Sequence, residues 1–375
     1  MHVVLIEFRT STPFPVQLAN ALGKLCQVTL MLPISKKSPA TALDLDSVAL
    51  QPFHLPRTRD PANLGTMLRL RRRLQVEHPD LVHITCWHMW GTPGLGLGSR
   101  FRQVSTVHDV SRHPGDGWAY PSWLYPLQWR WADQVIVHAN AARQQLLAKH
   151  GLQPDHVHVI PIGAYDFYRA WMQDDRMERP NTVLFFGRIW EYKGLEYLIE
   201  AEPLITRAIP DARIVIAGYG DSFEKYQKAM VNPHHFEVLN YRIPDEMVAE
   251  LFQRASVVVL PYIEASQSGV ISVAYAFGKP VVGTNVGGIP DVVDDGLTGY
   301  LVPPRDKNSL AEAIIALLKD PKSRADMGRR ALEKTKTQMS WSNIAEQTLD
   351  VYQQALEGTP RGYDSLSSSP DSGHS

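Results

Sequence analysis

Short apolar segments alternate with longer amphipathic segments along most of this chain. Strands separated by helices in this way are typical of a parallel β-sheet whose two faces are covered by helices. The alternation stops between Ala164 and Pro180, where charged residues and a proline interrupt it, and then begins again. A chain of 375 residues is long enough for two domains. We therefore expect an α/β protein of two similar units joined by one linker, with the ligand site in the cleft between them.

The pattern predicts individual elements and domain limits. Strands are expected at His2–Ile6, Val28–Leu32, Asp80–Thr85, Val104–His108, Gln134–Val137, Val157–Ile160, Thr182–Phe186, Arg213–Ala217, Phe236–Leu239, Val257–Leu260, Pro280–Thr284 and Gly299–Val302. Helices in the first half are expected near Phe14–Leu25, Ala62–Glu77, Trp123–Ala132 and Ala141–His150. We place the first domain at residues 1–165, the second at 181–340, and a last helix at 341–357 that could cross back to the first domain. Residues 358–375 are rich in Ser, Pro, Gly and Asp, so we expect a disordered tail.

Composition excludes several classes of protein. The net charge of −1 provides no overall attraction to nucleic acid, and 44% hydrophobic residues are normal for a globular protein. No apolar run reaches the ~18 residues that a membrane-spanning helix needs. The first residues are typical of a strand rather than of a signal peptide. Cys26 and Cys86 lie in apolar contexts and are interpreted as reduced core residues, so we expect a cytoplasmic protein.

An arginine and a lysine lie at the end of the strand that opens the second half. Gly187 allows the backbone to turn after Phe186, Arg188 follows it, and Lys193 precedes a helix that begins near Gly194. A guanidinium offers a planar pair of donors to phosphate oxygens, and an ammonium offers a compact charge. Together they could hold a diphosphate and stabilise it as a leaving group. A surface arginine and lysine beside an ordinary turn is the alternative for this segment alone.

A polar loop follows the strand Val257–Leu260. Its turn, Ser266 to Gly269, precedes a helix from about Val270 to Phe277, whose first N–H groups could bind an anion. The carboxylate of Glu264 would repel a phosphate, so it is better suited to accept hydrogen bonds from sugar hydroxyls. An exposed loop acid is the alternative interpretation.

Together these segments resemble the retaining glycosyltransferases of family 4, which have the GT-B fold of two Rossmann-like domains facing a central cleft. The resemblance covers nearly all of the chain from Thr182 to Lys319, in the right order. Its matching stretches include Phe186–Arg188, Lys193–Gly194, Ala276–Val282, Gly287–Asp291 and Gly296–Pro303. The resemblance implies transfer of a hexose from a nucleotide-diphosphate sugar to an acceptor hydroxyl, without metal or added cofactor. Polysaccharide or glycolipid assembly is the usual context of such enzymes.

The resemblance also implies roles for individual residues. Arg188 and Lys193 would stabilise the departing diphosphate, and Glu264 would hold the sugar. The donor would further contact Gly187, Arg242, Ile243, Ser268, Gly269, Val270 and Ser272. No obvious second carboxylate is available as a covalent nucleophile, which fits a same-face mechanism in which the leaving phosphate helps to deprotonate the acceptor.

The chain departs from the family at one position after the strand Val257–Leu260. The family usually has a second glutamate there, and this glutamate contacts the donor ribose. Ser272 or Val273 occupies its place here, and Ser272 could supply a weaker hydrogen bond. The loss leaves open a non-catalytic protein that binds nucleotide sugars. A nicotinamide-dependent oxidoreductase would share the α/β alternation, but it needs a glycine-rich first turn, and the segment from Arg9 to Pro15 contains no glycine.

The acceptor side is predicted from the first domain. Thr106-Val107-His108-Asp109 matches the family pattern Thr-x-His-Asp at a strand end. His108 is predicted to contact the sugar or the acceptor, and Asp109 to orient its ring. Arg112 and His113 follow in a polar loop on the same side. A purely structural histidine is the alternative.

Two further segments allow more than one interpretation. The basic run Arg69–Arg73, with the aromatic residues between Trp118 and Trp131, could form a membrane-surface patch that reaches a lipid-linked acceptor on the inner face of a membrane. A solvated basic helix and a tryptophan-rich core helix are the preferred alternative. Asp44-Leu45-Asp46 has the form of a metal-binding pair but is better interpreted as an exposed loop.

Overall fold

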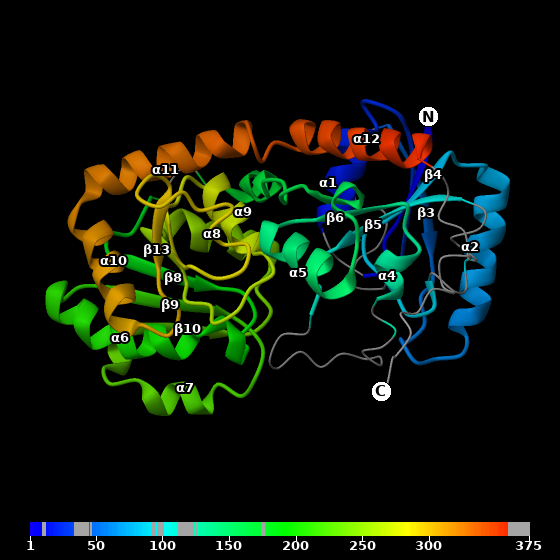
Figure 1. Cartoon of the computed structure of the whole chain (residues 1–375). Coiled ribbons are helices and arrows are strands. Elements are labelled where there is room, and N and C mark those ends of the chain that lie inside the picture. The colour runs from blue at the N-terminus through cyan, green and yellow to red at the C-terminus, as the bar shows by residue number, and fades with distance from the viewer. Residues whose placement is uncertain are drawn as a thin grey trace, which may run out of the picture.

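Two parallel β-sheets, each covered by helices, make up the computed structural model of the chain (Figure 1). It describes residues 1–9, 13–33, 45, 47–91, 95, 101–111, 124, 126–173 and 177–358. The strand orders are β3-β2-β1-β4-β5-β6-β7 and β10-β9-β8-β11-β12-β13, and all pairings between these strands are parallel. The chain direction across each sheet reverses next to its first strand, β1 or β8, as in Rossmann folds. The expected α/β protein with two Rossmann-like domains is confirmed.

The elements of the first domain are bounded as follows. Its strands are β1 His2–Ile6, β2 Gln27–Pro33, β3 Val48–Phe53, β4 Leu81–Ile84, β5 Arg102–Val107, β6 Gln134–Val137 and β7 Val157–Val159. Its helices include α1 Pro13–Leu22, α2 Asn63–Glu77, α4 Leu127–Arg130, α5 Asn140–His150 and the short 3-10 helix η3 Pro154–His156. The linker contains η4 Asp166–Trp171.

The second domain and the last helix follow. The strands are β8 Thr182–Phe186, β9 Arg213–Gly218, β10 Phe236–Asn240, β11 Val257–Leu260, β12 Val281–Thr284 and β13 Gly299–Val302. The helices are η5 Glu191–Lys193, α6 Leu195–Ala208, α7 Glu224–Ala229, η6 Pro233–His235, α8 Asp245–Arg254, α9 Gly269–Ala276, α10 Lys307–Lys319, α11 Pro321–Lys336 and α12 Trp341–Glu357.

The expected strands are all present, with differences only at their ends, but one strand was missed. β3 is an edge strand, mostly half-exposed, and it contains Pro52, which an edge position tolerates. The helix expected over Trp123–Ala132 is described only as α4, where Trp129 is buried. Cys26 and Cys86 are both unpaired, as expected. Asp44, Asp46, Arg112, His113 and residues 359–375 lie outside the described residues.

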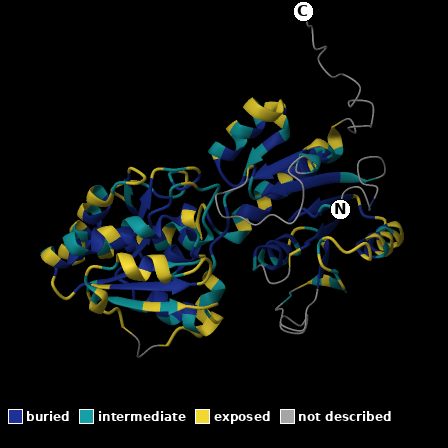
Figure 2. Ribbon diagram, turned by 90° about the horizontal axis from the view of Figure 1, so that it is seen from below, coloured by how far each residue is buried: buried dark blue, intermediate teal, exposed yellow. Residues whose placement is uncertain are grey.

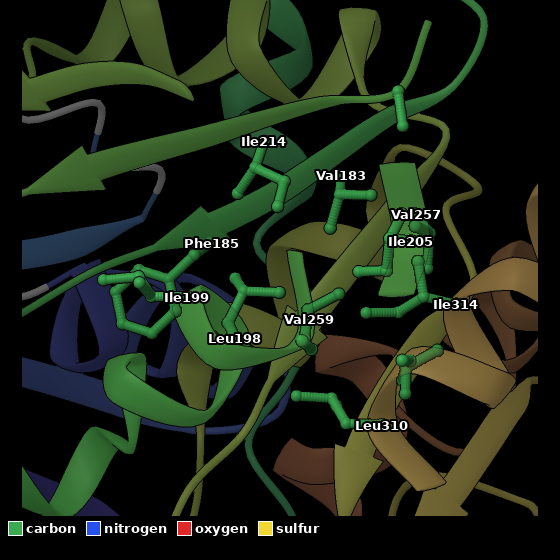
Figure 3. Packing of buried hydrophobic residues seen from close by; sticks show 14 of the residues in the cluster. Val183, Phe185, Leu198, Ile199, Ile205, Ile214, Val257, Val259, Leu310 and Ile314 are labelled. Carbon is green, nitrogen blue, oxygen red and sulfur yellow. The ribbon is translucent and has the colours of Figure 1, made fainter. Parts of the chain in front are cut away.

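Alternate residues of the second sheet pack into separate cores on its two faces. Val183 and Phe185 of β8 and Val257 and Val259 of β11 pack with α6 and α10 on one face (Figure 3). Leu184 and the intervening residues of β11 pack with α8 and α9 on the other. Because both faces are covered, β8 and β11 are almost entirely apolar and almost fully buried, whereas the edge strand β10 is partly exposed; the burial view contains strands of both kinds (Figure 2). This explains why simple apolar runs predicted them.

The last helix returns to the first domain. α12 lies beside α1 (Figure 1), and its apolar face belongs to the same buried cluster as β1 and β2. The hydroxyl of Tyr352 is hydrogen-bonded to Nδ1 of His83 at 2.7 Å, and Nε2 of His83 to the hydroxyl of Thr106 at 2.8 Å. The C-terminal helix therefore completes the core of the first domain.

The two passages of chain between the domains are hydrogen-bonded to each other. The N–H of Ala164 donates to the carbonyl of Met339 at 2.8 Å. The indole Nε1 of Trp341 donates to the carbonyl of Ala164 at 2.7 Å. A Cβ on Gly163 would lie 2.5 Å from the Trp341 ring, so only glycine allows this packing. We call residues 163–164 with 339–341 the crossing.

Replacing Tyr352 with Phe should destabilise the first domain by about 1–3 kcal/mol, because it leaves Nδ1 of the buried His83 without a partner. Urea unfolding would measure this loss. Tyr219→Phe is the control, since Tyr219 is 50% exposed and should change stability by less than about 0.5 kcal/mol. Equal effects of the two substitutions would contradict the proposed docking of α12.

Candidate functional site

Arg188 is held on a rigid backbone at the carboxyl end of β8. The pairing with β9 continues past the strand ends, because Gly187 donates to the carbonyl of Ala217 at 2.9 Å and Ile189 to that of Tyr219 at 2.8 Å. The Arg188 side chain itself is exposed. A cation is thus presented to solvent from a backbone that cannot easily move.

The continued pairing needs a glycine on the facing strand. Gly218 has φ of +154°, and a Cβ there would lie 1.6 Å from the carbonyl oxygen of Gly187. The two backbones therefore approach more closely than any side chain would allow.

Both predicted cations contact Tyr192, and Lys193 also contacts Tyr262, which follows β11. The Lys193 ammonium lies 3.7 Å from the centre of the Tyr262 ring, and the charge of Arg188 acts on the Tyr262 hydroxyl. The Arg188 guanidinium also lies 4.0 Å from the Trp190 ring and donates to the Tyr192 hydroxyl at 3.2 Å. Each contact between a cation and the face of an aromatic ring contributes about 0.5–2 kcal/mol of favourable free energy. These rings orient the two cations without neutralising their charge.

Tyr262 also joins the cations to the polar loop. Burial raises the pKa of Tyr262 to about 12, although its hydrogen bond with Ser268 and the charge of Arg188 act in the opposite direction. Its hydroxyl lies 3.2 Å from the hydroxyl of Ser268, which directly precedes α9. A Cβ on Gly187 would lie 3.6 Å from a methyl of Val270. The structure therefore brings Gly187, Arg188, Lys193, Ser268, Gly269 and Val270 together, as predicted from their strand-end positions.

The loop that carries Glu264 is tied to the lysine segment. The N–H of Ile263 donates to the carbonyl of Tyr192 at 2.8 Å, while the Glu264 side chain is exposed. Next to it, Gly287 has φ of +54°, and a Cβ there would lie 1.5 Å from the carbonyl oxygen of Ala265. The Gly287–Gly288 turn thus supports this loop from the side of β12.

Ser272 is not placed where a surface ligand could reach it easily. Ser272 lies inside α9 and is 2% exposed. Its carbonyl accepts a hydrogen bond from the N–H of Tyr165 at 3.4 Å. Val273 is also buried, at 4% exposure. Neither of the two positions inferred for the missing acid therefore offers the family's ribose contact directly.

Arg242 and Ile243 follow β10, at the edge of the sheet. Arg242 is exposed, and its charge acts on Tyr168 of the linker and Asp245 of α8. Ile243 packs against the second-domain core. Their place at the same carboxyl edge as Arg188 is compatible with the predicted contact to the donor.

Lys279, in the stretch Gly278–Pro280, lies elsewhere. Its ammonium pairs with the Glu178 carboxylate at 3.1 Å, and Arg324 pairs with the same carboxylate at 3.0 Å. Lys279 precedes the amino end of β12, opposite to the edge that carries Arg188. Its role is to fix the linker to the second domain.

His108 follows β5 at the carboxyl edge of the first sheet, and both of its ring nitrogens contact groups other than Asp109. The ring Nε2 contacts the carbonyl of Thr85 at 2.9 Å, and Nδ1 lies 3.1 Å from Nε2 of His138. The pKa of His108 is lowered to about 3, mainly by burial and in addition by the charges of His138 and Arg9, while the charge of Asp109 acts to raise it. Asp109 therefore acts through charge, while a second histidine supplies the contact.

Three residues at the carboxyl edges of the two sheets were not predicted as site residues: His88, His138 and Tyr262. Each of them follows the end of a strand, and this position is the sequence signal that could have identified them. His88 stacks on Phe8 with ring centres 5.5 Å apart, and neither of its buried ring nitrogens has a hydrogen-bond partner among the described residues.

The carboxyl edges of the two sheets meet through the loops that follow β6 and β12. The backbone N–H and the side-chain amide of Asn140 both donate to the Asp291 carboxylate, at 2.6 and 3.2 Å. A Cβ on Gly288 would lie 2.5 Å from the Cβ of Ala139. Asp291 of the second domain thus caps the first turn of α5 in the first.

Comparison with known proteins gives family matches to both domains. A family model described as Glycosyltransferase Family 4 matches residues 15–164, and one described as Glycosyl transferases group 1 matches residues 180–320. The alpha-maltose-1-phosphate synthase of Mycolicibacterium smegmatis is 33% identical over 266 residues, which cover 64% of this chain and 67% of that protein.

Solved structures share the fold over almost the whole chain. The sucrose-phosphate synthase of Thermosynechococcus elongatus has a TM-score of 0.71 at 21% identity, covering 94% of this chain and 98% of that one. The Anabaena protein HepE, in complex with UDP-glucose, has a TM-score of 0.70 at 17% identity, covering 94% and 99%. The expected GT-B fold is confirmed.

Replacing Gly218 with Ala should destabilise the second domain by more than about 2 kcal/mol, because the new Cβ forces β8 and β9 apart beside Arg188. Gly296→Ala is the matched control, since Gly296 also has positive φ but has no atom within 4 Å of a built Cβ. Chemical unfolding measures both. A Gly218→Ala protein as stable as the control would contradict the close approach.

Proposed function

The chain belongs to the group 1 glycosyltransferases of family 4, and we propose that it transfers a hexose with retention of anomeric configuration and without a metal ion. Solved structures of the same fold that contain UDP or UDP-glucose support a nucleotide-sugar donor. The observation that carries the proposal is that Arg188 and Lys193 both contact Tyr192, while Lys193 also contacts Tyr262, whose hydroxyl lies beside the first turn of α9. Two fixed cations and backbone N–H groups match the charge and the oxygen atoms of a diphosphate.

The proposed reaction takes place on one face of the donor sugar. The bond between the anomeric carbon and the diphosphate oxygen breaks, and the acceptor oxygen bonds to that carbon from the same side. The leaving diphosphate takes the acceptor proton, so the protein needs no covalent nucleophile. Arg188 and Lys193 stabilise the negative charge that grows on the diphosphate. Glu264, exposed on its loop, accepts hydrogen bonds from the sugar hydroxyls.

A non-catalytic protein that binds nucleotide sugars is the second candidate. The burial of Ser272 and Val273 favours it, because the family's acidic contact to the ribose has no evident replacement there. Such a protein would bind a nucleotide diphosphate but show neither transfer nor hydrolysis of the donor. A thermal-shift screen with UDP, GDP, ADP and dTDP, followed by a donor hydrolysis assay, distinguishes the two candidates and identifies the base.

Contact with a membrane surface is part of the proposal, and α2 supports it. Leu64, Leu68 and Val76 are 51%, 46% and 78% exposed on this helix, and with the exposed Arg72 they follow a spacing of four residues. An apolar stripe beside arginines fits a helix that lies on anionic lipid. No helix in the described ranges is long and apolar enough to cross a membrane. A lipid-linked acceptor for polysaccharide or glycolipid assembly fits this surface.

The double variant Arg188→Ala with Lys193→Ala should lose transfer by about a thousandfold or more, since each cation contributes as a fixed donor to the leaving group. The matched control replaces two exposed cations of the same types, Arg329→Ala with Lys228→Ala. A thermal melt confirms folding, and Lys193→Met tests the charge while keeping the aliphatic packing. Near-normal turnover in the folded double variant would contradict the proposed role of Arg188 and Lys193 in stabilising the leaving diphosphate.

Flotation with vesicles that contain ~30% phosphatidylglycerol tests the surface of α2. The wild type should float, and replacing Leu64, Leu68 and Val76 with Gln should abolish flotation, because the apolar stripe is lost. Leu297→Gln, at a 50% exposed leucine of the second domain, should have no effect. A wild-type protein that stays with the bottom fraction would rule out the membrane contact.

A further inference from the structure

Two histidines occupy the carboxyl ends of the neighbouring strands β5 and β6, and three polar contacts run through them in series. His108 Nε2 contacts the carbonyl oxygen of Thr85 at 2.9 Å. His108 Nδ1 contacts His138 Nε2 at 3.1 Å. His138 Nδ1 contacts the carbonyl oxygen of Ile160 at 2.9 Å. All four ring nitrogens are therefore engaged.

These contacts require more protons than two neutral rings carry. Carbonyl oxygens only accept hydrogen bonds, so His108 Nε2 and His138 Nδ1 must both be protonated to bond them. The contact between the two rings needs a further proton on one of its nitrogens. A neutral imidazole carries a single N–H, so a neutral pair leaves one of the contacts as two facing lone pairs.

Packing prevents the rings from turning away from each other. Phe14 of α1 lies edge-on to His108 at 5.5 Å and to His138 at 5.3 Å between ring centres. Trp341 of α12 lies against the same phenyl ring at 5.7 Å. The pair is thus enclosed by apolar groups on the side of the crossing.

Charged and titratable groups on three neighbouring loops and strands act on the pair. Asp109, after β5, favours the protonated form of both rings, and Arg9, after β1, opposes it at His108. His83 of β4 interacts with His138 through charge. Burial lowers the pKa of His138 to about 4, while its bond to Ile160 raises it. Burial therefore disfavours the protonated form of the pair, whereas the contact between the two rings favours it.

We propose that His138 is a positioning residue for His108, and that the two rings share one additional proton across their facing nitrogens. While the pair holds this proton, both nitrogens of His108 are engaged within the first domain. Loss of the proton breaks the contact between the rings. Nδ1 of His108 can then accept a hydrogen bond from a hydroxyl of the sugar or of the acceptor substrate. This last consequence rests on the proposed function, whereas the shared proton does not.

Ring ¹⁵N NMR of histidine-labelled protein, titrated downward from pH 8, tests the shared proton without any substrate. His138→Phe and His108→Phe each leave one histidine whose bond to a carbonyl is satisfied in the neutral state. The wild-type pair should take up its third proton at least about one pH unit above the remaining histidine of either variant, a tenfold higher proton affinity. Asp109→Asn should lower the wild-type midpoint, and His158→Phe should not change it, because His158 bonds Gln134 instead of a histidine.

The proposal is overturned if the wild-type pair titrates at or below the pH of the single variants, or takes up no third proton before the protein unfolds. If transfer is detected, a pH profile adds a second readout. The acid limb of kcat/KM should move to lower pH in His138→Phe, because the unshared His108 remains neutral further into acid. In His138→Gln, an amide can donate to Nδ1 of His108, so the ring should keep its place, with KM near the wild-type value. A protein that shares the proton but transfers no sugar would refute only the proposed function.

Discussion

Two hydrogen bonds at one residue, Ala164, join the two passages of chain between the domains, and the arrangement of the site depends on them. Its N–H bonds Met339 and its carbonyl bonds the Trp341 indole. Both connections between the sheets pass through this crossing, so it sets the angle at which the two carboxyl edges face each other. The absence of a side chain at Gly163 lets the indole pack there.

The crossing and the site are in direct contact through side chains. The Trp341 indole lies against Phe14, and Phe14 lies against both His108 and His138 of the proposed acceptor side. On the opposite side of the interface, Asp291 caps α5, which begins two residues after His138. A change in the angle between the domains therefore displaces the two histidines and the turn that carries Asp291.

The sequence predicted those features that depend on local pattern. β8 and β11 are buried on both faces, so their apolar runs were easily recognised, and the end of the β8 run placed Arg188 at the carboxyl edge of the sheet. What it could not predict are contacts between distant segments. Nothing local indicates that Tyr262 contacts Lys193 or that His138 contacts His108. Counting along the loop placed Ser272 at the ribose, but the packing of α9 buries it.

The return of α12 to the first domain has a consequence for how the chain folds. The core around β1 and β2 lacks one wall until Ile344, Val351 and Tyr352 have been synthesised. The second domain, between them in sequence, contains its own cores and can fold earlier. The first domain made is thus the last to be completed, and its closing contacts, such as His83 with Tyr352, are separated by 269 residues. Contacts of such long range fold slowly, so the exposed apolar face of α1 must be protected from aggregation until the end of the chain emerges.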